Sequence, residues 1–478
     1  MFPFASEVAA ARNAQLSWSR LPLRERLRPV RRLRALLVER TDDVIAAIAS
    51  DIARPAVEIL SSELLATAAA LKFLERRAIR ILAPRRISWR LRPIWLMGSR
   101  DIVHRRPWGV VGIIGTWNYP IFLNAIQVAQ ALAAGNAVLW KPSENVPRTA
   151  DLMHALLLEA GFPPDLFHKL PATRDAGPQL AEAEVNYIVF TGSDTVGRKL
   201  AARLGERLIP STLELSGCDA MFVLADADVE MAALAAWFGV TLNRGQTCIA
   251  VRRIFVARSI ESAFTVALRK LAANAAPVSL VTPGQSIQAE KLIEDAIARG
   301  ATSTSPRGIG LGPTFLLNAP PDAAICTEAC FAPVAAVIPY DSVDDAVGWA
   351  HRSPFGLAAS IFSSDVETAK LIAARIPAGH VSINDALAPT AHPATPFGGL
   401  GASGWGVTQG REGLLAMTVP QTVTARKGTF RPHFDEAANS DPATEDVLRG
   451  LLRATHARVV RERLRGLWQL MRGARRKK

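Results

Sequence analysis

The stretch WGVVGIIGTWNYPIFLNAIQVAQALAAGNAVLWKPS, residues 108–143, decides the fold class. It begins and ends with short apolar runs, VVGII and AVLW, that read as buried strands. Gly109 to Trp140 contains no charged residue, yet its glycines, asparagines, glutamines and proline are too frequent for a membrane-spanning helix, which needs about 20 predominantly apolar residues. We therefore predict a buried strand, a loop and a helix, followed by a second strand.

The same alternation continues along the chain. VNYIVFTGS followed by DTVGRKLAARLG reads as another strand and helix, and such alternation predicts a parallel sheet with crossover helices on both faces, a layout typical of nucleotide-binding domains. After PSTLELSG, residues 210–217, the pattern starts again with AMFVLADA, so we expect a second α/β domain of similar design. The Gly- and Pro-rich residues 388–410 have the composition of a segment that crosses back over a site.

Residues 21–83 are expected to be helical, because apolar positions recur there every three to four residues. Within them, the residues TDD, beginning at Thr41, are interpreted as a capped helix start.

The composition indicates a globular chain of two or three domains, with 478 residues, 49% hydrophobic and 21% charged. Four cysteines are too sparse for a disulfide framework and indicate a reducing compartment. The first twenty residues contain Glu7 and lack both a basic start and a continuous apolar run, so we find no signal peptide. A cytoplasmic location follows as the expectation.

Cys248 ends a short polar run, NRGQTCIA, in an otherwise apolar neighbourhood. A cysteine is nucleophilic as the thiolate, and a helix start or a nearby cation would lower its pKa. The alternative is a small buried hydrophobic side chain without chemistry.

Two motifs at a defined distance favour the chemical interpretation. The residues GQTC, which end at Cys248, and the residues LELSG around Glu214 lie 34 residues apart, counted from Glu214 to Cys248. Together they resemble the active-site motifs of the aldehyde dehydrogenase superfamily. Further resemblances follow in order along residues 20–430, in the segments PWGVVGIIGTWNYP, WKPSE, FTGS, FAPV and PFGGLGASGWG.

The resemblance implies an α/β fold with a Rossmann-type cofactor domain, an α/β catalytic domain and a small β oligomerisation arm. The expected NAD-binding domain comprises residues 1–84 and 107–214, and the expected catalytic domain comprises residues 215–400. Residues 85–106 and 415–430 would form the arm, and residues 431–478 a basic amphipathic tail. A homo-oligomer, dimer or tetramer, is expected.

The resemblance also implies the catalytic roles. Cys248 would attack the aldehyde carbon, and Glu214 would activate the water that releases the acid. Asn118 and the backbone N–H of Cys248 would stabilise the oxyanion, and losing one such donor typically costs about 2.7–4 kcal/mol.

The cofactor residues implied by the resemblance are Lys141, Ser143, Glu144, Gly192, Ser193, Gly197, Phe331 and Trp117. A turn between a strand and a helix presents N–H groups to phosphate, although a tight turn without a ligand has the same pattern. The carboxylate of Glu144 would repel a 2′-phosphate, which favours NAD, while Lys141 could tolerate NADP.

The chain departs from the family pattern at several positions. Ala329 stands where the family has a glutamate before Phe331, with Glu328 one place further away, and this puts the nicotinamide-ribose contact in doubt. Ser216 and Cys218 also depart from the motif that follows Glu214. No metal site is expected, because the closely spaced Cys326 and Cys330 lack a suitable histidine or acidic pair nearby.

Basic residues are concentrated in two segments, 76–106 and 443–478, and the second has eleven lysines and arginines against three acids. Its helical pattern places Val460, Leu464, Leu467, Trp468 and Met471 on one face beside several arginines. This pattern is typical of a helix in an anionic membrane interface, here the inner face of the membrane, and a helix packed on protein is the alternative. We do not expect a nucleic-acid partner.

A membrane-bound enzyme would act on a lipophilic aldehyde, fatty or isoprenoid-derived, and Trp117, Trp405 and Phe397 are expected along an apolar channel. Two other functions stay open at this point. One is reduction of an acyl-CoA by the same fold, which the presence of Glu214 disfavours, and the other is a non-catalytic scaffold that binds membrane or nucleic acid.

Overall fold

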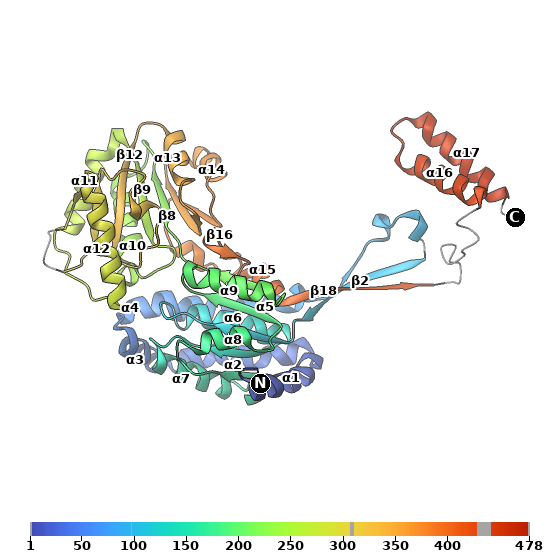
Figure 1. Ribbon diagram of the computed structural model, residues 1–478, viewed down its shortest axis with the longest axis horizontal. Coiled ribbons are helices and arrows are strands. Elements are labelled where there is room, and N and C mark those ends of the chain that lie inside the picture. Colours follow the sequence, from blue (N-terminus) through green and yellow to red (C-terminus); the bar gives the residue numbers. More distant parts are fainter. Residues whose placement is uncertain (1, 97, 306–309, 428–440, 477–478) are drawn as a thin grey trace. The chain divides into compact units, whose positions relative to one another are not determined.

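The computed structural model describes residues 2–96, 98–305, 310–427 and 441–476. The chain forms two compact units: Met1–Pro84 with His104–Gln421, and Arg85–Val103 with Thr422–Lys478. We describe each unit by itself. In the first unit, helices cover the faces of two large sheets, as Figure 1 shows.

The first sheet has six strands in the order β17-β7-β6-β3-β4-β5. All of its pairings are parallel except that of β17 (Gly404–Trp405) with β7 (Ser211–Glu214). The residues that decide the fold form β3 (Val110–Ile114), α6 (Phe122–Ala134) and β4 (Ala137–Lys141), which confirms the strand, loop, helix and strand expected there. Strands β5 (Phe167–Lys169) and β6 (Tyr187–Thr191) complete the sheet.

The strand order reverses beside β3. From β3 the chain runs through α6 and α7 (Pro147–Glu159) to β4 and β5, and from there it returns through α8 (Ala176–Glu182) to β6, on the other side of β3, and through α9 (Asp194–Glu206) to β7. Right-handed crossovers place these two pairs of helices on opposite faces. A ligand crevice is expected at the carboxyl ends of β3 and β6, because the chain leaves these two neighbouring strands toward opposite faces of the sheet.

The second sheet has seven strands in the order β10-β11-β12-β9-β8-β14-β15. These are β8 (Asp219–Val223), β9 (Val251–Ala257), β10 (Thr302–Ser303), β11 (Thr314–Leu317), β12 (Val334–Tyr340), β14 (Ala358–Phe362) and β15 (His380–Ile383). Its helices are α10 (Val229–Thr241), α11 (Arg258–Ala272), α12 (Pro283–Ala298), α13 (Val343–Ala350) and α14 (Val366–Ala373). The second α/β series is thus confirmed, and only β10 pairs antiparallel.

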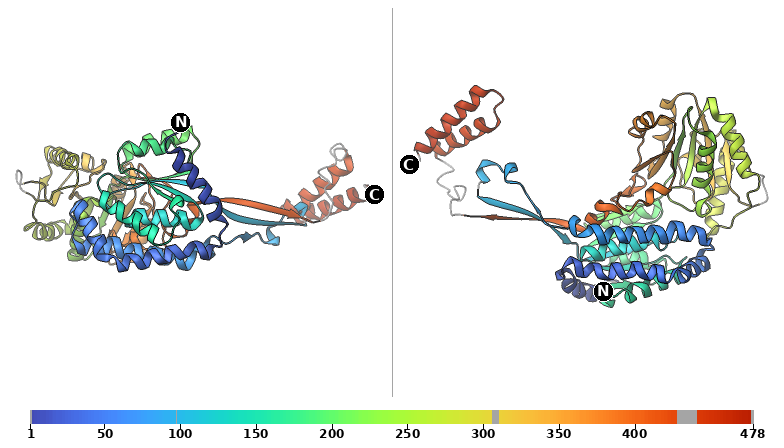
Figure 2. Two further views of the ribbon diagram at one scale, coloured as in Figure 1. Left: turned by 90° about the horizontal axis from the view of Figure 1, so that it is seen from below. Right: turned by 180° about the vertical axis from the view of Figure 1, so that it is seen from behind.

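The N-terminal helices are α1 (Ala5–Arg20), α2 (Leu23–Glu39), α3 (Thr41–Ile52), α4 (Ala56–Ile59) and α5 (Leu65–Ile81), with a π-helical turn at Leu60–Leu64 between the last two (Figure 2). The expected helices of residues 21–83 are present, but α1 was missed. The expected cap at Thr41 is wrong, since Thr41 is the first helical residue and its hydroxyl donates to the carbonyl of Leu37 at 3.1 Å.

The Gly- and Pro-rich residues 388–410 return from the second sheet to the first. Strand β16 (Leu400–Gly401) pairs with β13 (Phe355–Gly356), and β17 then pairs Gly404 with Glu214. Gly404 has a φ of 96°, and a Cβ there would lie 2.0 Å from the carbonyl oxygen of Leu213. Glycine is required because this crossing passes so closely over β7. Helix α15 (Gly410–Ala416) follows.

A three-stranded sheet, in the order β1-β2-β18, contains β1 (Arg85–Arg86), β2 (Ser99–Pro107) and β18 (Thr418–Arg426). The second unit also contains short 3-10 turns at Trp89–Leu91 and Ile94–Leu96, and the helices α16 (Pro442–His456) and α17 (Val460–Arg476). The tail is thus two helices where the sequence indicated one. Residues 428–440 and 477–478 of the expected arm and tail lie outside the described residues. Among the described helices, none combines the length and the hydropathy that crossing a membrane requires.

Candidate active site

Cys248 lies at the junction of two cavities in the first unit. One, which we call the polar cavity, has a volume of about 390 Å³ and mostly polar residue types in its wall, and Asn118, Glu214 and Cys248 line it together. The other, of about 200 Å³, is mostly apolar and has Cys248 in its wall as well. Folding therefore brings the three expected catalytic side chains to one cavity, and Cys248 lies in the wall of both cavities.

Glu214 is held by backbone pairing on both sides. It is the last residue of β7, opposite Thr191 of β6 and Gly404 of β17. Its side chain is buried, and its Oε1 atom has no hydrogen-bond partner in the described part of the chain. Burial raises the pKa of Glu214 to about 7, and a hydrogen bond from the Cys248 thiol opposes this shift. A carboxyl group with a pKa near neutrality can exchange protons at physiological pH.

The expected lowering of the Cys248 pKa is wrong. Burial raises the pKa of this thiol well above its ordinary value, and the charge and hydrogen bonding of Glu214 raise it further. The backbone N–H of Ile249 opposes the shift only weakly. Cys248 lies in a loop between Gly245 and Val251 and does not start a helix, so the helix start that would lower its pKa is not present at this residue. The resting residue is a neutral thiol beside a base.

The side-chain amide of Asn118 has a defined orientation. Its Oδ1 accepts from the hydroxyl of Thr116 at 2.7 Å, and its Nδ2 donates to the carbonyl oxygen of Gln246 at 3.2 Å. A flipped amide would instead place the Asn118 side-chain oxygen 3.2 Å from the carbonyl oxygen of Gln246, and both atoms are acceptors. Since an amide nitrogen carries two N–H groups and one is occupied, the second N–H is left for a ligand in the cavity.

The loop before Cys248 has an unusual backbone. Asn243 and Arg244 have positive φ angles of 51° and 57°, and Gly245 follows with 73°. A Cβ at Gly245 would lie 2.4 Å from the backbone of Ala332, so the loop packs directly on the FAPV segment. The buried guanidinium of Arg252 donates to the carbonyls of Gly245, Ala332 and Val334 and ties the same two segments together. Hydrogen bonds at this density indicate that the strained loop is held firmly.

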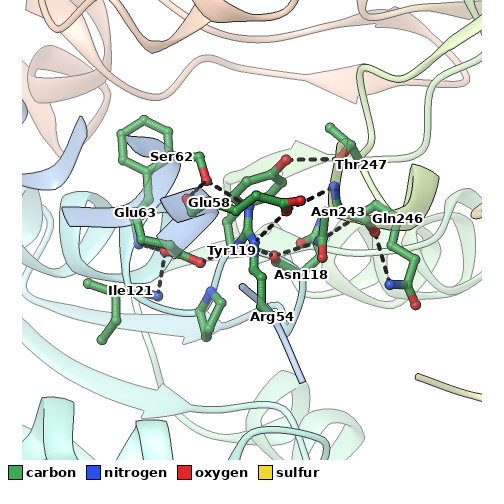
Figure 3. A network of polar contacts seen from close by, with 12 residues as sticks. Arg54, Glu58, Ser62, Glu63, Asn118, Tyr119, Ile121, Asn243, Gln246 and Thr247 are labelled. Carbon is green, nitrogen blue, oxygen red and sulfur yellow. Dashed lines mark hydrogen bonds and ion pairs between the residues drawn. The ribbon is translucent and has the colours of Figure 1, made fainter. Parts of the chain in front are cut away.

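A buried ion pair between Arg54 and Glu63 lies next to the Asn118 loop (Figure 3). Arg54, fully buried, donates to Glu63 at 3.0 Å and to the backbone carbonyl of Asn118 at 3.2 Å. Glu63 accepts in addition from the backbone N–H groups of Ile121 and Phe122, at 3.1 and 2.7 Å.

The same network reaches the loop before Cys248. The Arg54 guanidinium lies 4.4 Å from the ring centre of Tyr119, whose hydroxyl bonds that of Thr247 at 2.8 Å. Asn243 donates to the Asn118 carbonyl at 3.1 Å. Arg54 therefore positions both the Asn118 loop and the residue before Cys248 without lining either cavity. The sequence analysis missed this network, since no local pattern marks it.

Replacing Arg54 with methionine is expected to lower the free energy of unfolding by about 3–5 kcal/mol, because Glu63 would be left buried without its partner. We also expect kcat to fall by about 10²-fold, since small displacements of catalytic groups are costly. Urea unfolding and steady-state assays check this. Arg375→Met, which removes the exposed pair with Asp344, is the matched control and should cost at most about 1 kcal/mol. An R54M protein as stable and active as its parent would contradict the supporting role.

The polar cavity lies where the crevice was expected. Trp117 follows β3, while Gly192 and Ser193 follow β6, and all three line it. Ser193 caps α9 by accepting from the N–H of Val196 at 3.4 Å. Trp117 faces Phe331 edge-on, with ring centres 6.1 Å apart.

Residues without a recognised motif complete the polar cavity. The start of α12 contributes Thr282, Gln285 and Gln288, where Thr282 and Gln285 form a capping box. Ala329 lines the cavity, whereas Glu328 accepts from Gln288 at 2.9 Å. Gln285 and Gln288 thus line the same cavity as Ala329, the residue that stands at the motif position of the family glutamate. The capping pattern could have placed a helix start here, but nothing in the sequence linked it to the site.

A third cavity, of about 660 Å³, contains the other expected cofactor residues Lys141, Ser143 and Glu144. Lys141 donates a hydrogen bond to the Glu144 carboxylate at 3.3 Å, and the exposed Arg174 donates to the same carboxylate at 2.9 Å. Burial acts to raise the pKa of Glu144, but its backbone N–H, Arg174 and Lys141 outweigh burial and hold that pKa below its usual value. Trp117 and Thr282 line both this cavity and the polar one. The two cavities therefore adjoin.

Gly197 lines none of the three cavities. A Cβ there would lie 2.4 Å from the side chain of Leu215, so Gly197 allows α9 to pack on the sheet.

The expected apolar channel is present with a different lining. Phe397 lines the cavity of about 200 Å³, together with Phe122, Leu123, Phe238, Leu242, Ile249 and Leu387. The expectations for the two tryptophans are wrong: Trp117 lines the other two cavities instead, and Trp405 is half exposed and donates to the hydroxyl of Ser211 at 3.2 Å.

Cys218, Cys326 and Cys330 are buried free thiols. Within the described ranges, histidine, cysteine and acidic side chains do not gather in any group of three that could hold a metal ion.

Comparison with known proteins identifies the class that this fold and site define. The model of the aldehyde dehydrogenase family matches residues 4–423, and the chain belongs to that family. A 4,4'-diapolycopene aldehyde oxidase of Methylomonas sp is 33% identical over 425 residues, covering 87% of this chain and 80% of the relative. A putative NADP⁺ succinate-semialdehyde dehydrogenase of Mycolicibacterium smegmatis is also 33% identical, over 88% of this chain and 84% of the relative.

The crystal structure of a Mycobacterium tuberculosis aldehyde dehydrogenase complexed with NAD⁺ has the same fold, with a TM-score of 0.82. It is 30% identical and covers 89% of this chain and 90% of that one. These relationships confirm the α/β fold class and the family, and they favour neither the acyl-CoA reductase nor the non-catalytic scaffold.

Proposed function

We propose that this protein oxidises a lipophilic aldehyde to the carboxylic acid with NAD, using Cys248 as the nucleophile. The observation that carries the proposal is that Cys248 opens to an apolar cavity on one side and to a polar cavity with Glu214 and Asn118 on the other.

The first step is attack of the Cys248 sulfur on the aldehyde carbon. The thiol proton moves to Glu214, which is hydrogen-bonded to it and has a pKa of about 7. The carbonyl oxygen becomes an oxyanion, which the second N–H of Asn118 and the backbone N–H of Cys248 would stabilise. Thr116 and Gln246 hold the Asn118 amide in place for this task.

Bound NAD would accept a hydride from the tetrahedral carbon, which leaves a thioester on Cys248. Glu214 gives up the thiol proton to solvent. Its carboxylate, whose Oε1 has no hydrogen-bond partner among the described residues, then takes a proton from water as the hydroxide adds to the thioester carbon, and the thiolate leaves with that proton returned to it. One aldehyde, one NAD⁺ and one water thus yield one acid, one NADH and one proton.

The residues present fit a dinucleotide. Gly192 and Ser193 at the start of α9 provide N–H groups for phosphate, and Trp117 and Phe331 flank the polar cavity. Lys141, Ser143 and Glu144 would hold the adenosine ribose in the third cavity. We propose NAD as the preferred cofactor, because the Glu144 carboxylate stays charged. Lys141 and Arg174 leave NADP as a slower alternative.

The lining of the substrate cavity supports a lipophilic aldehyde. Phenylalanine, leucine and isoleucine side chains dominate, and of the described residues in this wall none is charged. A substrate with a second, anionic end, such as succinate semialdehyde, would have no cation to pair with. Burying that carboxylate would cost several kcal/mol.

Steady-state kinetics with linear aldehydes of rising chain length test the substrate class. We expect kcat/KM with NAD to rise about four-fold per added methylene until the cavity is filled, since each buried methylene contributes about 0.8 kcal/mol. Succinate semialdehyde should be the poorest substrate. A higher kcat/KM for succinate semialdehyde than for a longer uncharged aldehyde would contradict the proposal, and reduction of acyl-CoA by NADH as the faster reaction would favour the sibling function.

The organisation of the chain is part of the proposal. Residues 1–84 and 107–214 would hold NAD, residues 215–400 would carry the nucleophile, and residues 85–106 and 415–430 would join subunits in a dimer or tetramer. We also propose a cytoplasmic enzyme held peripherally at the inner membrane face through residues 443–478. Their excess of arginine and lysine supports this location.

A further inference from the structure

The two C-terminal helices contact each other through glycines. A Cβ at Gly450 of α16 would lie 2.6 Å from the backbone nitrogen of Leu470, and one at Gly466 of α17 would lie 2.4 Å from that of Ala454. A Cβ at Gly473 would likewise meet Val447 at 2.7 Å. The two helices lie side by side (Figure 1), and they approach so closely at these three positions that a larger side chain there would not fit.

The large apolar side chains of this hairpin lie outside that contact. A water-soluble hairpin normally buries its apolar stripe between its helices. Here the stripe is exposed on both helices, with Leu464 and Trp468 61% and 59% exposed. The exposed set comprises Leu448 and Leu452 of α16 and Val460, Leu464, Leu467, Trp468 and Met471 of α17. Small residues at the helix contact and large apolar residues outside is the pattern of helices that pack in lipid.

Basic side chains form a separate stripe. With about 100° of rotation per residue, Arg461, Arg465 and Arg472 fall together on one side of α17, next to the apolar stripe. On α16, Arg449 and Arg453 likewise lie on the side of the helix next to Leu448 and Leu452.

Polar contacts mark the same side of the hairpin. Arg453 donates to Gln469 at 3.2 Å, and Gln469 donates to Asp446 at 3.1 Å. Arg472 lies 5.5 Å from the ring centre of Trp468. The hairpin thus carries Arg461, Arg465 and Arg472 on one side of α17 and leucine, valine and methionine on another.

We propose that the hairpin Pro442–Arg476 is a closed lipid-binding unit that lies in the interface of an anionic phospholipid bilayer. The apolar stripes of both helices enter the acyl region, and the arginines contact the headgroup phosphates. The inference deepens the proposed peripheral location and, for its biological purpose, rests on the lipophilic substrate proposed above. The charge decides for lipid over a second protein, because arginines accompany the apolar stripe along both helices and an anionic bilayer satisfies both at once.

Binding of the full-length protein to vesicles tests the proposal. Vesicles of phosphatidylglycerol with phosphatidylcholine are compared with vesicles of phosphatidylcholine alone, and sedimentation measures bound protein. We expect binding to the anionic vesicles that weakens with added salt. The triple change of Arg461, Arg465 and Arg472 to serine should weaken it by about 100-fold, since each basic residue near such a surface contributes about five-fold.

Three further variants separate the elements of the proposal. Leu464→Glu with Leu467→Glu places charge in the apolar stripe and should remove binding, whereas Leu371→Glu, at an exposed position of α14, is the matched control and should leave it unchanged. Gly466→Leu forces the helices apart and should weaken binding. Unchanged binding in L464E/L467E would overturn the lipid face, and unchanged binding in G466L would overturn the closed hairpin.

The outcome is separable from that of the proposed function, because each variant is also assayed with a short water-soluble aldehyde and NAD without vesicles. A protein that oxidises the aldehyde but does not bind anionic vesicles overturns the lipid-binding unit and leaves the enzyme intact. A protein that binds anionic vesicles but oxidises no aldehyde overturns the proposed enzyme activity and leaves the lipid-binding unit intact. If L464E/L467E dissociates an oligomer and still binds vesicles, the apolar face is a contact between copies, and the proposal is wrong.

Discussion

Replacing Cys248 with alanine is expected to lower kcat for aldehyde oxidation on the order of 10⁶-fold, the size of loss seen when a nucleophile acts as one unit with its base. The residue is the only sulfur that lines the described cavities, and Glu214 beside it cannot substitute for a nucleophile that must form a thioester. Steady-state production of reduced cofactor with a saturating aldehyde measures the effect.

The control distinguishes lost chemistry from lost structure. Cys218→Ala removes a buried thiol that donates to the carbonyl of Ile325 and lines no described cavity, so it should keep most of the activity. The C248A protein should still bind NAD, as measured by calorimetry. Turnover by C248A at the rate of its parent would refute the proposed nucleophile.

Replacing Glu214 with glutamine is expected to lower kcat by about 10²–10⁴-fold, the usual contribution of a general base. The first turnover should suffer less than the later ones. Glu214 takes the thiol proton in the first step, but removing its charge also removes a cause of the raised pKa of Cys248, whereas hydrolysis of the thioester loses the carboxylate that activates water. Rapid mixing should therefore show a burst of reduced cofactor, followed by slow turnover.

The pH dependence has a definite sign. In the parent, kcat should rise as pH increases through about 7, because the base is active when deprotonated, and this limb should be absent from E214Q. The folded pKa of Glu214 lies above that of an unfolded glutamate, so the folded state binds more protons between pH 4.5 and 7 and stability falls as pH rises through that window.

E214Q should consequently be the more stable protein above pH 7, by up to about 3 kcal/mol. Urea unfolding at several pH values measures this difference. Glu206→Gln, at an exposed surface position, is the control and should change neither the burst nor the pH profile. Equal stability of E214Q and parent across this window would show that the carboxyl group is not buried in a protonated form.

Much of the fold could be predicted because its signals are local. The strand of VVGII and the helix of residues 122–134 follow from hydrophobic period and turn residues within a few positions. Helix α1 was missed although its buried residues Val8, Ala11, Gln15 and Trp18 have helical spacing, since alanine and a glutamine make a weak apolar stripe. Thr41 does not cap α3, because only Arg40 separates α2 from α3 and the Thr41 hydroxyl donates to the carbonyl of Leu37 in α2.

By itself, the sequence determined the parallel α/β class, the family, and which residues could serve as nucleophile, base and oxyanion donor. Only the tertiary structure decided that Arg54 supports Asn118 and that burial raises rather than lowers the Cys248 pKa. It also decided that none of the described residues lining the apolar cavity is charged, and that the glycines lie at the contact of the two C-terminal helices while the apolar stripes are exposed. The reason is separation along the chain. Periods and caps act between neighbours, whereas burial, ion pairs and cavities join residues such as Asn118 and Gln246, which are 128 positions apart.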